Sequence, residues 1–128
     1  MLDLVVVNRR EQVEVRRNVG DGTASSPTVT GNWLALRVRQ PAPNTQAVGA
    51  WVEVRFDGRV VSREITVGGG HASGDNGFIH VGLGNATRAE VRVTYPGQPA
   101  GAWQPLEAGA FYDMSRSAGA PIRLQPRD

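Results

Sequence analysis

The amino-acid sequence predicts an all-β domain, folded as an antiparallel β-sandwich or a partly open barrel of about 7–9 short strands. Apolar residues recur with a period of two through most of the chain, which is typical of strands with one buried face. Gly 16 and Pro 8 stand mostly between these short runs, where they mark turns. No run of about ten residues has the pattern of a helix. A chain of 128 residues is long enough to bury a real core as one domain.

The clearest single strand is predicted over residues 32–39. Leu34, Leu36 and Val38 share one face of this strand and are the candidate core residues. Trp33 has the opposite parity and is expected on the other face. Prolines in the residues that follow predict a loop.

The strongest hairpin is predicted over residues 48–67. Its turn is Asp57-Gly58, because both central residues of a type I′ turn need positive φ. Alternate residues over 50–56 are expected on the core face. Trp51 is expected on the opposite face, as Trp33 is.

Further strands are predicted over residues 78–83, 89–95, 103–106 and 122–124. Residues 107–116 are expected to hold one helical turn. Gly109 argues against a longer helix there.

The chain divides by composition into three parts. Residues 1–20 predict a strand hairpin with its turn near residues 9–11. Residues 21–31 are rich in turn-forming types and predict a linker. Residues 32–128 then form the main β domain.

Charge and cysteine content exclude several classes of protein. All 14 basic residues are arginine, but 12 acidic residues leave a net charge of only +2. Acids lie close to the two basic pairs, so a nucleic-acid partner is not expected. Cys is 0, which excludes disulfides and thiolate metal sites. Neither a membrane span nor a signal segment is predicted, and the chain as given is expected to be soluble.

One polar cluster is the main candidate site: His71, Ser73, Asp75, Asn76 and His80. A serine–histidine–aspartate triad is conceivable from three of these residues. Triad members usually come from separate elements, however, and these three are neighbours in one glycine-rich loop. The favoured interpretation is a turn with ordinary polar residues, so no catalytic residue is predicted.

Metal binding by this cluster has little support in the sequence. His71, His80 and Asp75 could share a metal, but the chain has only 2 histidines and neither forms a closely spaced pair. Asp75 and Asn76 lack the dense acidic spacing of a calcium loop. No metal site is therefore predicted, and His80 is expected to make one structural hydrogen bond.

The glycines of residues 67–84 invite a phosphate-binding interpretation. A phosphate cradle needs a helix N-terminus after the glycines, and no helix is predicted there. These glycines are instead expected to serve positive φ or close backbone approach.

Trp33 and Trp51 are candidate binding residues because both lie opposite the inferred core. Exposed tryptophans on a sheet face suit sugar stacking or a protein interface. A second sheet or a neighbouring domain could equally cover them.

Several motifs together resemble the ASPIC/UnbV domain of the cartilage acidic protein family. Residues 44–50 read N-x-x-A-V-G-A, and residues 63–70 read R-E-I-x-V-G-G-G. Residues 79–86 read I-H-V-G-L-G-x-A, followed by V-x-V-x-Y-P over residues 91–96. The resemblance covers about residues 32–108. His71 and Gly74 depart from the family pattern, which often has an aromatic residue and glutamine there.

Residues 1–20 resemble the end of an FG-GAP/VCBS repeat, the kind that builds β-propeller blades. The acidic calcium loop of such repeats would precede Leu2, so calcium is expected only through an upstream repeat. No other cofactor is predicted. Residues 1–20 would lack their native partners, so they are expected to pair with another chain, as in a homodimer, or to extend the domain's own sheet.

The resemblance implies a non-catalytic binding or structural module of a propeller-containing protein, and an enzyme is not expected. The partner would be a protein, a glycan or the upstream propeller. Secretion or the cell envelope is the expected location. The alternative is a cytoplasmic accessory domain in enediyne-type biosynthesis, which would handle an apolar intermediate in a cleft lined by Trp51, Phe78 and Tyr95.

Overall fold

A computed structural model describes residues 2–70, 73–74 and 77–125. It confirms the all-β prediction, since every regular element in these residues is a strand. The chain divides into two compact units, Met1–Gly31 and Asn32–Asp128. His71, Asp75 and Asn76 lie outside the described residues.

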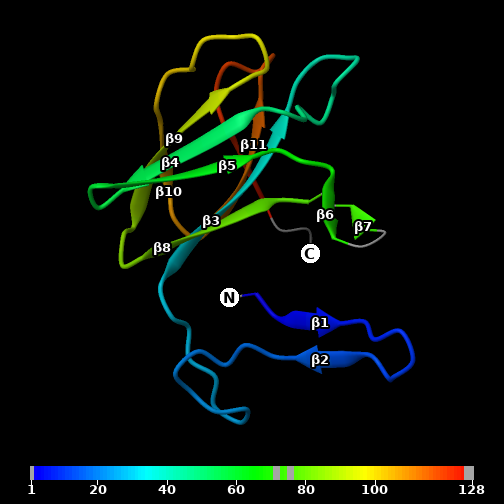
Figure 1. Cartoon of the computed structure of the whole chain (residues 1–128). Helices are drawn as coiled ribbons and strands as arrows, with labels where there is room; N and C mark the ends of the chain where they lie inside the picture. Colours follow the sequence, from blue (N-terminus) through cyan, green and yellow to red (C-terminus); the bar gives the residue numbers. More distant parts are fainter. Residues whose placement is uncertain (1, 71–72, 75–76, 126–128) are drawn as a thin grey trace. The chain divides into compact units, whose positions relative to one another are not determined.

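The first unit is a short antiparallel ribbon of β1 (Leu4–Val6) and β2 (Glu14–Arg16), drawn in blue in Figure 1. Val5 lies opposite Val15, and both valine side chains are largely exposed. An isolated two-stranded ribbon is marginally stable in water.

Two four-stranded sheets make up most of the second unit. Their strand orders are β10-β9-β4-β5 and β12-β11-β3-β8 (Figure 1). The strands are β3 (Asn32–Arg39), β4 (Trp51–Phe56), β5 (Arg59–Glu64), β8 (Ile79–Gly84), β9 (Arg88–Thr94), β10 (Gln104–Glu107), β11 (Ala110–Ser115) and β12 (Ile122–Leu124). Each sheet keeps two edge strands, so the arrangement is a sandwich and not a closed barrel.

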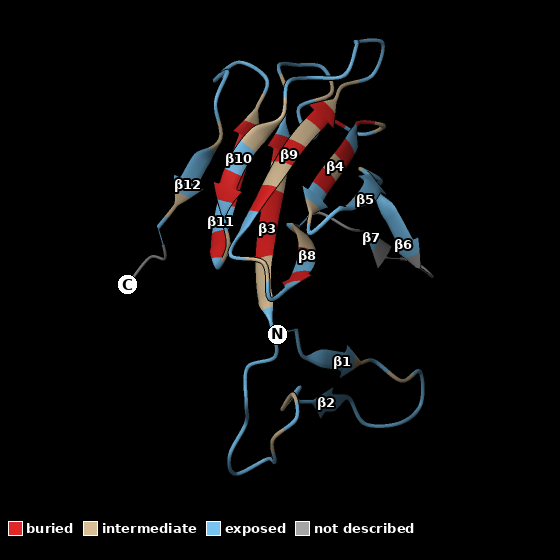
Figure 2. Ribbon diagram, turned by 90° about the vertical axis from the view of Figure 1, so that its left-hand side faces the viewer, coloured by how far each residue is buried: buried red, intermediate tan, exposed pale blue. Residues whose placement is uncertain are grey.

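The inner faces of both sheets share one core, shown in red in Figure 2. Leu34, Leu36 and Val38 of β3 are buried as their alternation predicts. The hairpin of β4 and β5 supplies Val52 and Val54 to the same core. Two-residue periodicity therefore assigned the core face of these strands correctly.

The Asp57-Gly58 turn between β4 and β5 is confirmed. Both residues have positive φ, 46° and 72°, as a type I′ turn requires. This turn places Trp51 opposite Glu64 and sets the register of the whole hairpin.

The prediction of a helical turn over residues 107–116 is wrong. These residues contain β11, an inner strand that lies parallel to β3. The alternation of Tyr112 and Met114 is present, but Asp113 and Phe111 obscure it. Asp113 is a charged residue that is buried, and Phe111 is an apolar residue that is half-exposed. The pair also makes the sheet mixed, whereas the sequence predicted only antiparallel strands.

The glycine-rich segment before β8 contains a small ribbon of β6 (Gly68–Gly70) and β7 (Ser73–Gly74). The prediction that the glycines of residues 67–84 serve positive φ or close backbone approach holds for Gly84, which has φ of 58°. It is wrong for Gly68 and Gly82, where an added Cβ would meet nothing within 4 Å.

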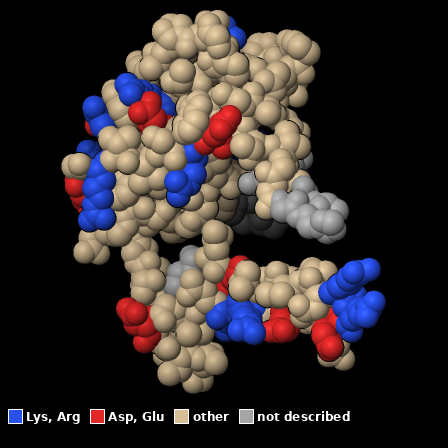
Figure 3. All heavy atoms as spheres, viewed as in Figure 1, with Lys and Arg blue, Asp and Glu red and all other residues tan. Residues whose placement is uncertain are grey.

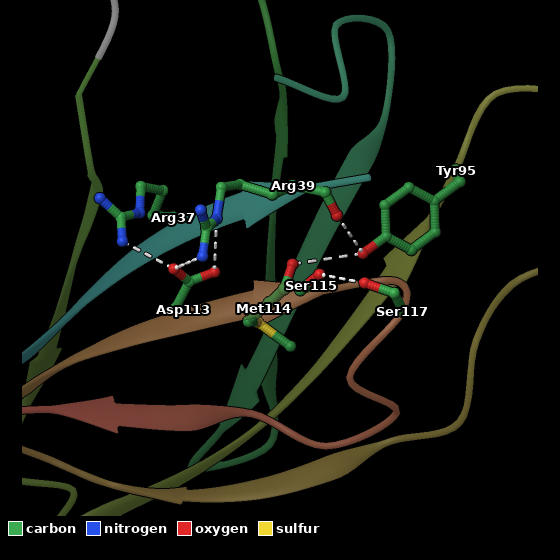
Figure 4. Close-up of polar contacts among 7 residues, drawn as sticks. All are labelled: Arg37, Arg39, Tyr95, Asp113, Met114, Ser115 and Ser117. Atoms are coloured by element: carbon green, nitrogen blue, oxygen red, sulfur yellow. Dashed lines mark hydrogen bonds and ion pairs between the residues drawn. The ribbon is translucent and has the colours of Figure 1, made fainter. Parts of the chain in front are cut away.

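Two tyrosines tie the sheets together across the core. The Tyr95 hydroxyl, just after β9, shares its hydrogen between the carbonyls of Arg39 and Met114, both at 3.3 Å (Figure 4). The Tyr112 hydroxyl of β11 donates to the carbonyl of Glu107 at 3.0 Å. Burial raises the pKa of Tyr95, so this hydroxyl remains a donor at neutral pH.

An ion cluster joins β11 to β3 on the outer face of their sheet. Asp113 is only 2% exposed and accepts hydrogen bonds from Arg37 Nη2 at 2.6 Å and Arg39 Nε at 3.1 Å (Figure 4). Arg39 Nη2 lies 2.5 Å from the same carboxylate. Burial alone would raise the pKa of Asp113, but the two guanidinium groups outweigh it and hold the pKa below the usual 3.8.

Asp113→Asn should lower the free energy of unfolding by about 1–3 kcal/mol at pH 7, because it removes the buried charge that both arginines bind. A carboxylate with a lowered pKa stabilises the fold above its unfolded pKa. The difference between wild type and variant should therefore shrink below pH 3.8. Urea unfolding at several pH values measures this.

Glu90→Gln is the matched control, because Glu90 also binds an arginine, Arg55, and its pKa is likewise lowered by that hydrogen bond. This pair is exposed and screened by solvent, so the variant should lower the free energy of unfolding much less than Asp113→Asn does. Equal effects of the two variants would contradict the importance of the Asp113 cluster.

Candidate functional site

The predicted site residues that the structure describes lie on different elements. His80 is in β8, Trp33 in β3 and Trp51 in β4. Ser73 is in β7. Trp33 and Trp51 belong to different sheets, and each lies on the face turned away from the shared core.

Four ring side chains gather on the outer face of the sheet that contains β3. We call this surface the aromatic face, and it consists of Trp33, Phe78, His80 and Phe111. The rings of Trp33 and His80 are stacked, with centroids 5.6 Å apart and an angle of 18°. Phe111 meets Trp33 edge-on at 5.1 Å and Phe78 edge-on at 5.0 Å. The four rings thus form one continuous chain of contacts.

Strand register explains why these rings meet. Ala35 of β3 lies directly opposite His80 of β8 on one side and Phe111 of β11 on the other. Residues directly opposite one another project from the same face of a sheet. The small Ala35 side chain is buried between its neighbours, at 2% exposure, and leaves room for larger rings around it.

The aromatic face remains open to solvent in part. Phe111 is 41% exposed and Phe78 is 36% exposed. Ile122 of β12 pairs with Asp113, which places it on the same face, and it is also exposed. Contiguous exposed apolar groups of this kind mark interaction sites on soluble proteins.

Charged groups border the aromatic face. The guanidinium carbon of Arg37 lies 5.4 Å from the centroid of the Phe78 ring, within the range of a cation–π contact. The same guanidinium group binds Asp113. Arg37 therefore stands at the border of the aromatic face with its positive charge only partly neutralised, because it shares the carboxylate of Asp113 with Arg39.

His80 is a titratable member of the aromatic face. Burial lowers its pKa from the usual 6.5, because a charged imidazole is poorly solvated there. The neutral ring is thus the form that stacks on Trp33 at pH 7. The contact that the structure describes for the His80 ring is this stacking on Trp33.

The outer face of the other sheet has the opposite character. It bears three Arg–Glu pairs along β4, β9 and β10, each at 2.6 Å: Arg92–Glu53, Arg55–Glu90 and Arg88–Glu107. Figure 3 shows basic and acidic side chains interspersed on the face in view.

Aromatic groups on this second outer face are either covered by cations or isolated. The guanidinium groups of Arg55 and Arg92 lie over Trp103, at 4.3 and 4.5 Å from the ring centroid. Trp51 is half-exposed on the same sheet. Three arginines of this face, Arg55, Arg88 and Arg92, thus each bind a glutamate of their own.

Two clefts open between the sheets. The first, of about 210 Å³, is lined by residues of β3 and by residues around the ends of β5 and β8. The second, of about 170 Å³, includes Tyr95. Trp51 and Phe78 line neither cleft, because they lie on the outer faces of different sheets. The apolar cleft expected from Trp51, Phe78 and Tyr95 is therefore not formed by these residues.

The described ranges contain neither a metal-binding cluster nor a membrane-spanning helix. No group of three or more histidine, cysteine or acidic side chains in the described ranges is placed to hold a metal ion. Within the same ranges, no helix is long and apolar enough to cross a lipid bilayer.

The sequence does not indicate Phe111 as part of the aromatic face, nor Asp113 as part of the ion cluster beside it. The sequence indicates Trp33 and His80 as separate candidates and does not show that their rings stack. The signal that was available is the alternation of Ala110, Tyr112 and Met114, which marks β11 as a strand and places Phe111 outward.

Comparison with known proteins identifies one family. No curated protein and no solved structure matches the chain. The family model described as "ASPIC and UnbV" matches residues 40–121, which is more than half of the chain. This match covers most of the sandwich, including the β4–β5 hairpin, β8, β9 and β11. The chain belongs to the ASPIC/UnbV family.

Proposed function

We propose that this domain is a non-catalytic binding module, an accessory part of a larger protein, that holds a protein partner on its aromatic face. The observation that carries the proposal is the contact chain of Trp33, His80, Phe111 and Phe78 on a solvent-facing sheet. Aromatic residues and arginine are enriched at protein interfaces. Both are present here, with Arg37 against Phe78.

Ring geometry favours a protein over a glycan. Stacking on a sugar requires an open ring face, and one face of Trp33 is taken by His80. Phe111 makes T-shaped contacts with both of its ring neighbours. An uneven apolar surface of this kind suits side chains that pack into it.

The sequence resemblance supports two wider proposals. Residues 1–20 are proposed to end an FG-GAP/VCBS repeat, so that the domain follows a propeller in a secreted or envelope protein. The exposed Val5 and Val15 of the β1–β2 ribbon would then be covered by that upstream repeat or by a second copy of the chain. Mass measurement of the purified full-length protein at several concentrations separates these two arrangements.

Photo-crosslinking tests the aromatic face directly. Phe111→p-benzoylphenylalanine, in the full-length protein in its own cells, should give a protein adduct of defined mass on illumination. The control is Val60→p-benzoylphenylalanine, since Val60 is exposed on the outer face of the other sheet, opposite Arg55. Only the first position should react.

Trp33→Ala in the Phe111 crosslinking background should reduce the adduct yield by about tenfold, as expected for removal of an aromatic interface anchor. Its fold is checked by the urea unfolding midpoint. An adduct that forms equally from Val60, an adduct to glycan only, or no adduct would each contradict the proposal.

Because the pKa of His80 is lowered in the folded protein, the free energy of unfolding should depend on pH. A histidine with a lowered pKa in the folded state stabilises the fold above its unfolded pKa, and this contribution is lost as the pH falls through the folded value. Wild type should therefore lose stability below pH 6.5 relative to His80→Phe.

Partner binding should weaken over the same interval, because protonation places a charge within the apolar aromatic face. The imidazole titration of His80, followed by NMR, measures the pKa itself. A midpoint at or above 6.5 would contradict the burial of this ring.

A further inference from the structure

β5 is an edge strand, and its outer edge has no strand partner among the described residues. The order of its sheet is β10-β9-β4-β5, so β4 lies on one side of β5 and the other side is open (Figure 1). At the far end of the same sheet, β10 contains Pro105, which has no N–H to offer a further strand. β5 contains no proline, so every residue of this edge strand keeps its backbone donor.

Strand register shows which backbone groups of β5 point to the open edge. The N–H of Ile65 donates to the carbonyl of Ala50, and its carbonyl accepts from Gly49, both at 2.8 Å. Ile65 follows β5 directly, and these bonds lie on the β4 side. In an antiparallel pair, alternate residues exchange such bonds with the neighbouring strand. The backbone groups of Val60 and Ser62, which have the other parity, therefore point to the open edge.

The inward side of this edge carries two arginines. Arg63 lies opposite Val52, whose side chain belongs to the core. Residues directly opposite one another project from the same face of a sheet, so Arg63, Val61 and Arg59 all have the inward orientation. Val61 packs against the core, whereas both arginines are exposed at the rim (Figure 2). The open edge thus presents a cation, an apolar residue and a second cation at alternate positions.

These two cations lack a carboxylate. In the described part of the chain, neither Arg59 nor Arg63 makes an ion pair. Glu64 lies opposite Trp51 and therefore projects from the outer face. Arg63 Nη1 instead donates to the carbonyl of Ser62 at 3.0 Å, which is one of the acceptors of the open edge. A carboxylate is a stronger acceptor for guanidinium than a carbonyl, so an acidic side chain would release this edge group.

A second copy of the chain is a poor occupant of the β5 edge. Two β5 strands paired antiparallel about Val61 would place Arg59 of each copy directly opposite Arg63 of the other. Like charges directly opposite one another destabilise strand pairing. An incoming strand with acidic residues at these positions would form opposite-charge pairs instead. The arginines therefore disfavour self-pairing and favour an acidic partner.

We propose that the β5 edge accepts an extended acidic segment of a partner polypeptide as a fifth strand of its sheet. The segment runs antiparallel to β5 and exchanges backbone hydrogen bonds with Val60 and Ser62. Its two acidic side chains bind Arg59 and Arg63, and an apolar residue midway between them packs beside Val61. This edge belongs to the other sheet from the aromatic face, and it stands or falls independently of the function proposed for that face.

NMR titration of the ¹⁵N-labelled full chain tests the proposal. The probe is the peptide acetyl-Ser-Glu-Thr-Val-Val-Glu-Ser-amide, whose glutamates reach Arg63 and Arg59 when its threonine lies opposite Ser62. It should shift the amides of Val60 and Ser62 saturably and slow their hydrogen exchange. The same peptide with lysine in place of both glutamates should bind at least about tenfold more weakly, because two opposite-charge pairs become like-charge pairs.

Backbone pairing is tested by N-methylation of the probe at one residue. The second valine lies opposite Val60, so its N–H faces β5, and a methyl group there should weaken binding by about tenfold or more. The first valine lies opposite Val61, and its N–H points away from β5. A methyl group on this residue should leave the affinity nearly unchanged, which makes it the matched control.

Charge reversal in the protein locates the carboxylate contacts. Arg59→Glu combined with Arg63→Glu should invert the preference, so that the lysine peptide binds more tightly than the glutamate peptide. Arg9→Glu combined with Arg10→Glu changes the net charge by the same amount and should leave the preference as it is. The unfolding midpoint in urea checks the fold of both variants, and the two N-methylated peptides test the wild-type protein whatever the variants do.

Four results would overturn the proposal. The first is the absence of a saturable shift at Val60 and Ser62. The second is equal affinity for the glutamate and lysine peptides, and the third is equal binding of the two N-methylated peptides. The fourth is a concentration-dependent shift of these amides without peptide, which would show that a second copy occupies the edge.

Discussion

The contact of Asp113 with Arg37 and Arg39 is the interaction on which the β3 sheet depends. β11 and β3 are parallel neighbours that are far apart in sequence, so no hairpin turn sets their alignment. A buried carboxylate is satisfied only where cations reach it. Asp113 lies opposite Arg37, and this fixes a register in which Tyr112 and Met114 face the core. A slip of one residue would turn both side chains outward.

The aromatic face follows from that same alignment. With Asp113 opposite Arg37, Phe111 must lie opposite Ala35, two residues earlier in both strands. β8 brings His80 to the other side of Ala35. The small side chain of Ala35 thus lies between the rings of His80 and Phe111, and Trp33 contacts both of these rings. The ion cluster and the aromatic face are consequences of one pairing and are expected to be lost together.

Local sequence patterns predicted what depends on local structure. The turn at Asp57-Gly58 and the buried face of β3 follow from φ preferences and from alternation within one strand. The position of β11 could not be predicted in this way, because burial of Asp113 depends on arginines about 75 residues earlier in the chain. The stacking of His80 on Trp33 is likewise non-local, since each residue taken alone fits several roles. Alternation within one strand does not specify which residue of a distant strand lies opposite, and both features depend on that pairing.

Arg37 and Arg39 connect the buried Asp113 to the outer face of the β3 sheet. Their charges are needed to bury Asp113, yet one carboxylate does not use all the donors of two guanidinium groups. Arg37 extends toward Phe78 of the aromatic face. The outer face of the other sheet differs in this respect, because each of its arginines has a glutamate of its own. The two outer faces therefore differ in how their arginines are paired: two arginines share one carboxylate beside the aromatic face, whereas Arg55, Arg88 and Arg92 each bind a separate glutamate on the other face.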